Sequence, residues 1–200
     1  MNADALDMIY IYGAHRVYTL LLRLFLKFDF IGKNVIVSPS CEISRRAAPY
    51  IHLGDGVRLA RDVWLNIAFE APELVKNKPI IKLSEGVFVG RRCFFSGINC
   101  IDIGRNVLFG PGVFITDHSH EYDNKEIPIM YQGATEGGEI VIEKGCWFGH
   151  NSALVTHKGR QIRIGRNSVI GANAVVTKSF PANSVLVGVP ARNAHSRRLK

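Results

Sequence analysis

The chain has 200 residues, of which 47% are apolar and 21% are charged, so it can build a core and lacks the bias of disordered chains. Its formal net charge of +8 favours an anionic partner. Lys and Arg are scattered, without the dense basic run or interleaved aromatic residues of a nucleic-acid site, so we expect no nucleic-acid partner. The four cysteines lie far apart without C-x-x-C spacing, which argues against a zinc site and a disulfide framework.

The first predicted element is an amphipathic helix within residues 1–30, spanning about Ala5–Phe28, with Arg16, Arg23 and Lys27 on a narrow polar stripe. Two roles stay open for it. It either packs on the rest of the protein or a neighbouring subunit, or it lies on the inner face of a membrane. No apolar run reaches the roughly 18 residues of a membrane span, and the N-terminus lacks the features of a secretory signal. We therefore expect a cytoplasmic protein, with peripheral membrane contact as the second possibility.

From Ile31 onward, apolar residues recur every six positions in groups of three. Glycine directly follows 8 of these 18 positions, where 19 glycines in 200 residues would place about two by chance. The position four after the first two apolar residues of each group is always small or β-branched, as at Val35 and Cys41. The apolar positions are Ile31, Val37, Ile43; Leu53, Leu59, Leu65; Leu83, Val89, Phe95; Ile103, Phe109, Ile115; Ile142, Phe148, Leu154; and Ile164, Ile170, Val176.

This period predicts an all-β fold: a triangular prism of parallel strands, in which three faces of about six residues complete one coil. The apolar residue points inward and stacks on its equivalent in the next coil, and the small residue lies at a corner. We expect glycine where the backbone turns tightly or takes a positive φ. Such a solenoid is stable only in several stacked copies. The prediction is a prism domain over residues 31–192, followed by a basic tail over 193–200.

Two of the five steps between groups exceed 18 residues by more than ten residues and predict insertions. The third group begins 30 residues after the second, with the excess within about 66–82, and the fifth begins 39 residues after the fourth. The longer insertion covers about 118–139 and opens with Asp117-His118-Ser119-His120. Because the repeat itself only needs to stack, functional residues are expected on such insertions.

Four segments together resemble the hexapeptide-repeat acyltransferases. They are Phe114–Tyr122, Gly145–Asn151, Ile170–Lys178 and Val187–Arg192, and the resemblance extends over about 31–192. It is closest to the enzymes that O-acetylate bacterial surface polysaccharides and to the galactoside and maltose acetyltransferases. The resemblance implies a left-handed prism, acetyl-CoA as co-substrate, no metal, and a homotrimer with each coenzyme cleft between two prisms.

The family's catalytic base corresponds to His118, and a two-residue gap in the alignment leaves His120 as the alternative. A neutral imidazole suits the removal of a proton from an acceptor near neutral pH. Its other ring nitrogen needs a hydrogen-bond partner, for which Asp117, Glu121 or a backbone carbonyl are candidates. The indole N–H of Trp147, or backbone amides of an opposing coil, are candidate donors to the developing oxyanion.

The resemblance also implies a set of coenzyme-binding residues in the last third of the chain. Lys178 and Arg192 would meet the coenzyme phosphates as charge-assisted contacts. The match departs from the family at Phe148, where isoleucine is usual, and at His150, where many members have a small residue. The predicted set is Trp147, His150, Ala172, Thr177, Lys178 and Arg192.

For the acceptor we expect a sugar hydroxyl, in a bacterial surface polysaccharide or its lipid- or nucleotide-linked precursor. The amine of an amino sugar is the alternative. Predicted acceptor-binding residues are Asn99, Asp117, Tyr122 and Tyr131, with Asp123 and Gln132 as further candidates.

Two other classes are weighed against this prediction. A metalloenzyme of the γ-carbonic anhydrase kind needs about three converging histidines, and no trio among His118, His120, His150 and His157 has that family's spacing. A catalytically silent scaffold is disfavoured because the chain retains the candidate base and the candidate coenzyme residues together.

Overall fold

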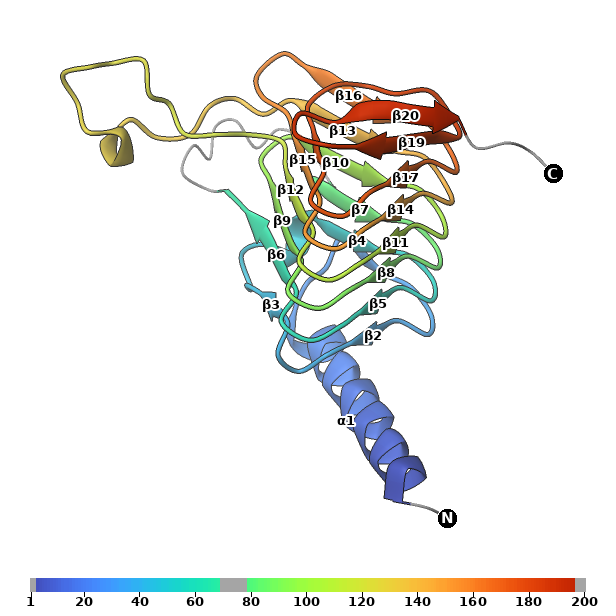
Figure 1. The fold of residues 1–200 in the computed structure, drawn as a ribbon. Coiled ribbons are helices and arrows are strands. Elements are labelled where there is room, and N and C mark those ends of the chain that lie inside the picture. Colours follow the sequence, from blue (N-terminus) through green and yellow to red (C-terminus); the bar gives the residue numbers. More distant parts are fainter. Residues whose placement is uncertain (1–2, 69–78, 197–200) are drawn as a thin grey trace.

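The computed structural model describes residues 3–68 and 79–196, and it shows a β-helix of stacked triangular coils with one helix at its base (Figure 1). The strands form three sheets, here called faces A, B and C, in which every neighbouring pair of strands is parallel except the last pair of face B. The predicted all-β prism is therefore confirmed. Most of the shorter predicted insertion lies at 69–78, outside the described residues.

Each coil contributes one short strand to each face, in the order A, B, C. Face A consists of β1 (Phe30–Ile31), β4 (Ile51–Leu53), β7 (Ile81–Leu83), β10 (Cys100–Ile103), β13 (Glu139–Ile142) and β16 (Gln161–Ile164). Face B consists of β2 (Ile36–Val37), β5 (Arg58–Leu59), β8 (Phe88–Val89), β11 (Leu108–Phe109), β14 (Trp147–Phe148), β17 (Val169–Ile170), β19 (Ser184–Val187) and β20 (Arg192–Ser196). Face C consists of β3 (Glu42–Ile43), β6 (Trp64–Ile67), β9 (Phe94–Gly97), β12 (Phe114–Thr116), β15 (Ala153–Val155) and β18 (Val175–Val176).

The inward residues are those that the six-residue period predicts. Of the 18 predicted positions, all are buried except Ile31 and Ile43 in the first coil, which are partly buried against the same core. Equivalent residues stack from coil to coil, as Phe109 and Phe148 of face B do with ring centroids 4.9 Å apart. Across the core, Phe95 of face C meets the Phe109 ring edge-on, with centroids 5.0 Å apart. Burial of one such side chain contributes about 1.5–3 kcal/mol, so the stacked core supplies most of the stability of the prism.

The predicted role of the glycines after the inward residues is wrong in one respect. These glycines do not have positive φ angles; the positive φ angles fall two residues later, at positions such as Asn34, Gly56 and Asn106. The glycine is required because the next coil passes very close. A Cβ on Gly104 would lie 2.7 Å from the backbone nitrogen of Lys144, closer than real Cβ contacts allow. The glycines therefore permit stacking, and the residue two positions on makes the turn; it is Asn or Gly except at Arg92.

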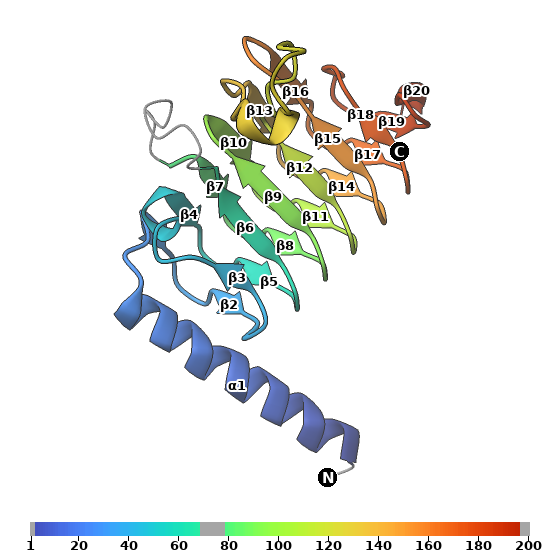
Figure 2. The same ribbon diagram turned by 90° about the vertical axis from the view of Figure 1, so that its left-hand side faces the viewer.

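The helix α1 (Ala3–Phe25) ends three residues before the predicted end and lies across the open base of the prism (Figures 1 and 2). Leu22 is buried against the first coil, and the Thr19 hydroxyl accepts the backbone N–H of Val37 at 2.9 Å. The Arg23 guanidinium donates to the carbonyls of Ile31 and Gly32. The helix thus packs against the first coil of the prism, and its membrane role stays a prediction.

The C-terminal end of the prism differs from the prediction of a tail over 193–200. Residues Arg192–Ser196 form β20, which pairs antiparallel with β19, while 197–200 lie outside the described residues. A last parallel strand would expose unpaired backbone groups at the edge of face B, and the antiparallel return of the chain pairs them. Among the described residues, no helix has the length and apolar character needed to cross a bilayer.

Candidate active site

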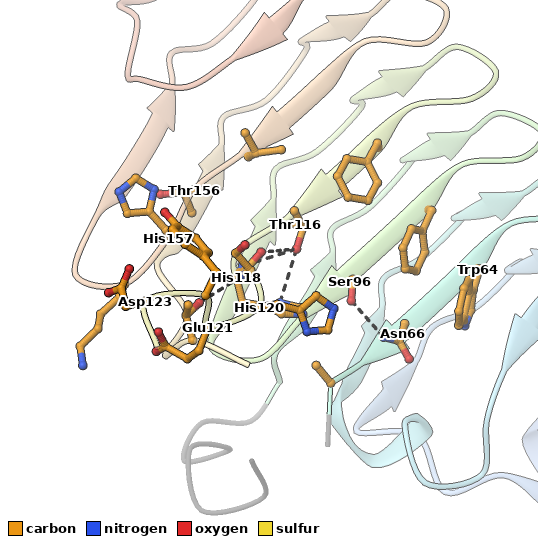
Figure 3. Close-up of a pocket in the computed structure, with 18 residues that line it drawn as sticks. Trp64, Asn66, Ser96, Thr116, His118, His120, Glu121, Asp123, Thr156 and His157 are labelled. Carbon is orange, nitrogen blue, oxygen red and sulfur yellow. Dashed lines mark hydrogen bonds between the residues drawn. The ribbon is translucent and has the colours of Figure 1, made fainter. Parts of the chain in front are cut away.

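A cavity of about 920 Å³ lies at the edge of face C, beneath the start of the long insertion (Figure 3). His118 and His120 line it together with Glu121, Tyr122 and Asp123 from the same loop. Residues 155–158, which follow the next coil's strand on face C, close another side of the cavity. The structure therefore brings both predicted candidates for the base to one cavity.

The floor of the cavity consists of two ladders on the outer surface of face C. One is aromatic: Trp64, Phe94 and Phe114 occupy equivalent positions, and the Trp64 and Phe94 rings stack with centroids 4.4 Å apart. The other is polar and lies nearer the insertion. Its members are Asn66, Ser96 and Thr116, and the Asn66 amide donates to the Ser96 hydroxyl at 2.9 Å.

The polar ladder is not among the residues predicted from the sequence. Its members directly follow the inward residue of the third hexad, in the position where glycine often stands elsewhere in the repeat. Three consecutive coils with a polar residue at that position are the signal from which the ladder is predictable.

Asp117 is completely buried and fixes the candidate base. Its carboxylate accepts the backbone N–H groups of Ile98, Asn99 and Cys100 at 2.8–2.9 Å. Its Oδ1 lies 2.9 Å from Nδ1 of His118. Because the carboxylate accepts hydrogen bonds, Nδ1 of His118 carries the hydrogen, and in the neutral imidazole Nε2 then keeps its lone pair.

The surroundings of His118 restrict its ring further. The side chain is only 12% exposed, and the Thr116 hydroxyl donates to the His118 carbonyl at 3.0 Å. A ring held by a buried carboxylate, with the second nitrogen unprotonated, is the arrangement that a general base requires.

A short antiparallel stem holds the insertion over the cavity. His120 pairs with Ala134 across the stem, and the Thr135 N–H donates to the Ser119 carbonyl at 2.8 Å. Beyond the stem, the Gln132 amide donates to the carbonyls of Asn124 and Ile127, both at 2.7 Å. The head of the loop, with its 3-10 turn at Ile129–Tyr131, projects away from the prism (Figure 1).

The predicted acceptor-binding residues fall into different places. Tyr122 lines the cavity, whereas Tyr131 lies in the exposed head of the insertion and does not. The Asn99 amide donates to the Gly138 carbonyl at 3.0 Å and so holds the end of the insertion on the prism. Asp117 has no exposed surface in this chain, because the backbone amides and His118 surround it, and it lies behind the base instead of facing an acceptor.

The predicted coenzyme-binding residues lie away from this cavity. Trp147 is half exposed on face B, and His150 and Ala172 lie at the exposed corner between faces B and C. Thr177 and Lys178 directly follow β18, on the same edge of the prism as His118 but two coils further along. Arg192 begins β20 on face B. Within one chain, these residues and His118 do not converge on one cavity.

The described residues contain no group of three or more His, Cys, Asp or Glu side chains arranged to hold a metal ion. His118 and His120 are near one another, but no third ligand of this kind joins them within the described ranges.

The chain and its fold have clear relatives. Residues 139–178 match the family described as "Hexapeptide repeat of succinyl-transferase". A Schizosaccharomyces pombe protein named as an acetyltransferase is 33% identical over 173 residues, which cover 82% of this chain and 73% of that protein. The chain belongs to the hexapeptide-repeat acyltransferases. Its prism is accordingly the left-handed β-helix of this family, as the resemblance implied.

The chain is also similar to a bacterial O-acetyltransferase in sequence and to a bacterial N-acyltransferase in structure. The lipopolysaccharide biosynthesis O-acetyltransferase WbbJ of Escherichia coli is 33% identical over 119 residues, which cover 56% of this chain and 59% of WbbJ. The structure of AntD, an N-acyltransferase from Bacillus cereus in complex with dTDP and 3-hydroxybutyryl-CoA, superposes with a TM-score of 0.70. That match covers 90% of this chain and 88% of AntD at 19% identity, and at this identity it shows the shared fold.

Proposed function

We propose that this enzyme transfers an acetyl group from acetyl-CoA to a hydroxyl group of a sugar, with His118 as the general base. The observation that carries the proposal is the Asp117–His118 pair, which leaves Nε2 unprotonated at the wall of a 920 Å³ cavity. His120 lines the same cavity and is the second candidate for the base.

The reaction needs one base and one oxyanion donor. The acceptor oxygen attacks the thioester carbonyl while Nε2 of His118 takes the hydroxyl proton. The tetrahedral intermediate then loses the coenzyme A thiolate as the C–S bond breaks, and the proton held by His118 passes to that sulfur. The buried Asp117 carboxylate stabilises the imidazolium that exists between these two steps.

The cavity floor has a polar ladder and an aromatic ladder, and a sugar can contact both. The polar ladder of Asn66, Ser96 and Thr116 presents groups that hydrogen-bond hydroxyls, and the Phe114 ring beside it suits the apolar face of a pyranose. WbbJ is named as an O-acetyltransferase of lipopolysaccharide biosynthesis, which supports a surface-polysaccharide acceptor. The amine of a nucleotide-linked amino sugar is the second candidate, because AntD is an N-acyltransferase bound to dTDP.

Acetyl-CoA consumption and the structure of the product test this proposal together. The enzyme is incubated with acetyl-CoA and with free sugars, oligosaccharides, lipid-linked sugars and nucleotide-linked amino sugars. We expect acceptor-dependent release of coenzyme A and a product with an alkali-labile ester. An alkali-stable amide would establish the N-acetyl alternative, and no acceptor-dependent release with any of these classes would contradict the proposed substrate class.

We propose that the working unit is a trimer in which neighbouring prisms complete each site. The outer surface of face A is polar, with Lys82 paired to Asp102 at 3.5 Å. Faces B and C instead present apolar rows, and Trp147 on face B is half exposed. The apolar rows are Phe88, Leu108 and Trp147 on face B, and Trp64, Phe94 and Phe114 on face C.

Contact between face B of one prism and face C of the next would bring the two rows to face each other around a threefold axis, with the cavity of His118 between them. It would also bring Trp147 of one subunit toward His118 of its neighbour. This arrangement would explain why the predicted base follows a strand of face C whereas Trp147 and Arg192 lie on face B of the same chain.

We also propose that the enzyme works in the cytoplasm, in peripheral contact with the inner face of the membrane through α1. This location supports access to lipid-linked sugar precursors, and the side of α1 that faces away from the prism is apolar.

A further inference from the structure

A second cavity, of about 520 Å³, lies between α1 and the first two coils, on the side of face B. Arg16 and Arg23 reach it from the helix, and Arg58 reaches it from β5. It is separate from the cavity of His118, and the acetyl-transfer chemistry does not use it.

The three arginines make this cavity a concentrated positive site. No carboxylate is among the described residues that line it, and none of the three arginines forms an ion pair with a described acidic side chain. The Arg23 guanidinium is held by its bonds to the Ile31 and Gly32 carbonyls, so its charge is fixed at the wall of the cavity. Convergent guanidinium groups bind phosphate oxygens more tightly than separate surface charges do.

The exposed side of α1 continues from this cavity as an apolar band. Leu20 lines the cavity, and Val17, Leu21 and Leu24 lie beyond it on the side away from the prism. Leu24 is 69% exposed and Val17 is 60% exposed. The surface of α1 therefore has three parts around the helix axis. One side packs on the prism, Arg16 and Arg23 lie next to it, and the apolar residues lie beyond the arginines.

We propose that this cavity binds the phosphate of an anionic lipid headgroup, with Leu20, Leu24 and Val17 seated among the acyl chains beside it. The inference rests on the membrane contact proposed above and gives that contact a defined site. Charge complementarity favours a membrane over a second copy of this chain. The apolar band lies beside three arginines, which an anionic lipid surface attracts, whereas a second chain would carry the same net charge of +8. A phospholipid has a phosphate beside apolar chains, which matches the arginine cavity beside the apolar band.

Co-sedimentation of the full-length protein with vesicles tests this site. The vesicles contain phosphatidylcholine alone or with about 30 mol% phosphatidylglycerol. We expect binding only to the anionic vesicles, weakened by about fivefold for Arg16→Gln or Arg58→Gln and by more than tenfold for both together, since each basic residue near an anionic surface contributes a factor of this size. Leu20→Ser with Leu24→Ser should weaken binding while leaving the charge unchanged.

The matched control is Arg105→Gln, which removes an equal charge from an exposed ion pair with Glu85 elsewhere on the prism and should bind vesicles like the wild type. Equal losses for this control and for each single arginine variant would show general attraction instead of a site, and would overturn the proposal. Binding of inorganic pyrophosphate that depends on Arg16 and Arg58, without vesicle binding, would assign the cavity to a soluble phosphate and overturn the lipid source.

A third readout separates this inference from the enzyme's chemistry. The leucine and arginine variants should keep the wild-type melting temperature, oligomeric state and acetyl transfer to a soluble acceptor. Dissociation of the oligomer by Leu20→Ser and Leu24→Ser, without vesicle binding by the wild type, would assign the band to a neighbouring subunit. Wild-type vesicle binding together with no acetyl transfer would leave the lipid site standing and contradict the proposed reaction.

Discussion

At the residue scale, the carboxylate of Asp117 determines what His118 can do. A buried carboxylate with three backbone N–H donors is fixed in place, and it orients the imidazole ring beside it. The sequence predicted Asp117 as one of several partners for the ring, but its complete burial follows from the turn at Ile98–Cys100 of the preceding coil, which no local pattern describes.

Asp117→Asn should therefore slow the chemical step more than it weakens substrate binding. The amide replaces a charged acceptor and points a donor toward either His118 or the backbone amides, so hydrogen bonds worth about 1.5–3 kcal/mol each are disturbed. We expect kcat to fall by about 10- to 100-fold with little change in KM for acetyl-CoA, together with a lower melting temperature. A large rise in KM with unchanged kcat would show that Asp117 acts through ligand binding instead.

Lys178 and Arg192 provide a separate prediction, because they are exposed and do not line the cavity of the base. Lys178→Ala and Arg192→Ala should each raise the apparent KM for acetyl-CoA. Each variant loses a charge-assisted contact worth about 1–3 kcal/mol. Both variants should be close to the wild type with a truncated donor that lacks the adenosine phosphates. Equal losses with both donors would assign the two residues another role.

At the element scale, the corners of the coils carry three buried cysteines in positions that valine, serine or alanine occupy in other coils. Burial raises the pKa of the Cys41, Cys93 and Cys146 thiols to about 11. Each thiol also lies near a backbone carbonyl of the following coil, as Cys146 does with Gly165 at 3.3 Å. These residues are structural, since a buried neutral thiol is a poor nucleophile.

The raised pKa values make stability depend on alkaline pH in a defined direction. In the unfolded chain these thiols ionise near 9.0, whereas in the folded prism they hold their protons up to about 11. Their contribution is therefore complete below pH 9 and is lost as the pH rises from 9 to 11. Denaturant unfolding should show a steeper decline over this range in the wild type than in a Cys41→Val, Cys93→Val, Cys146→Ser variant; parallel pH profiles would contradict this.

The elements also show which parts of the fold the sequence could specify. The inward positions and corner residues are visible in the chain because each coil imposes the same packing, so the period reports the core directly. The closing strand β20 was not predictable in this way, because it pairs antiparallel and leaves the repeat. The same limit applies to the cavity: the repeat located the insertion, whereas the stem that holds it over His118 depends on pairing outside the period.

At the scale of the whole molecule, a single prism leaves apolar rows on faces B and C uncovered and the candidate site divided between surfaces. Sedimentation at micromolar concentration should therefore give about three times the 22.2 kDa chain mass. An active, stable monomer would rule out the trimer and would require His118 and Trp147 to act without each other.

Mixed trimers extend this prediction to the site itself. Co-expression of His118→Ala and Trp147→Ala chains, each of low activity alone, should restore about a quarter of wild-type activity if each cleft takes the two residues from different subunits. If both parent variants are impaired and verified mixed trimers recover no activity, each cleft takes His118 and Trp147 from the same subunit.

The turnover of His118→Ala with saturating acetyl-CoA and acceptor bears most directly on the proposed chemistry. The side chain belongs to the insertion and not to the stacked core, so the variant should keep its trimer, melting temperature and coenzyme affinity. We expect the chemical step to slow by about 10²–10⁴-fold, the usual contribution of a positioned general base, and His120→Ala to be milder. A His118→Ala enzyme that retains more than about a tenth of the wild-type rate would contradict the assignment of His118 as the base.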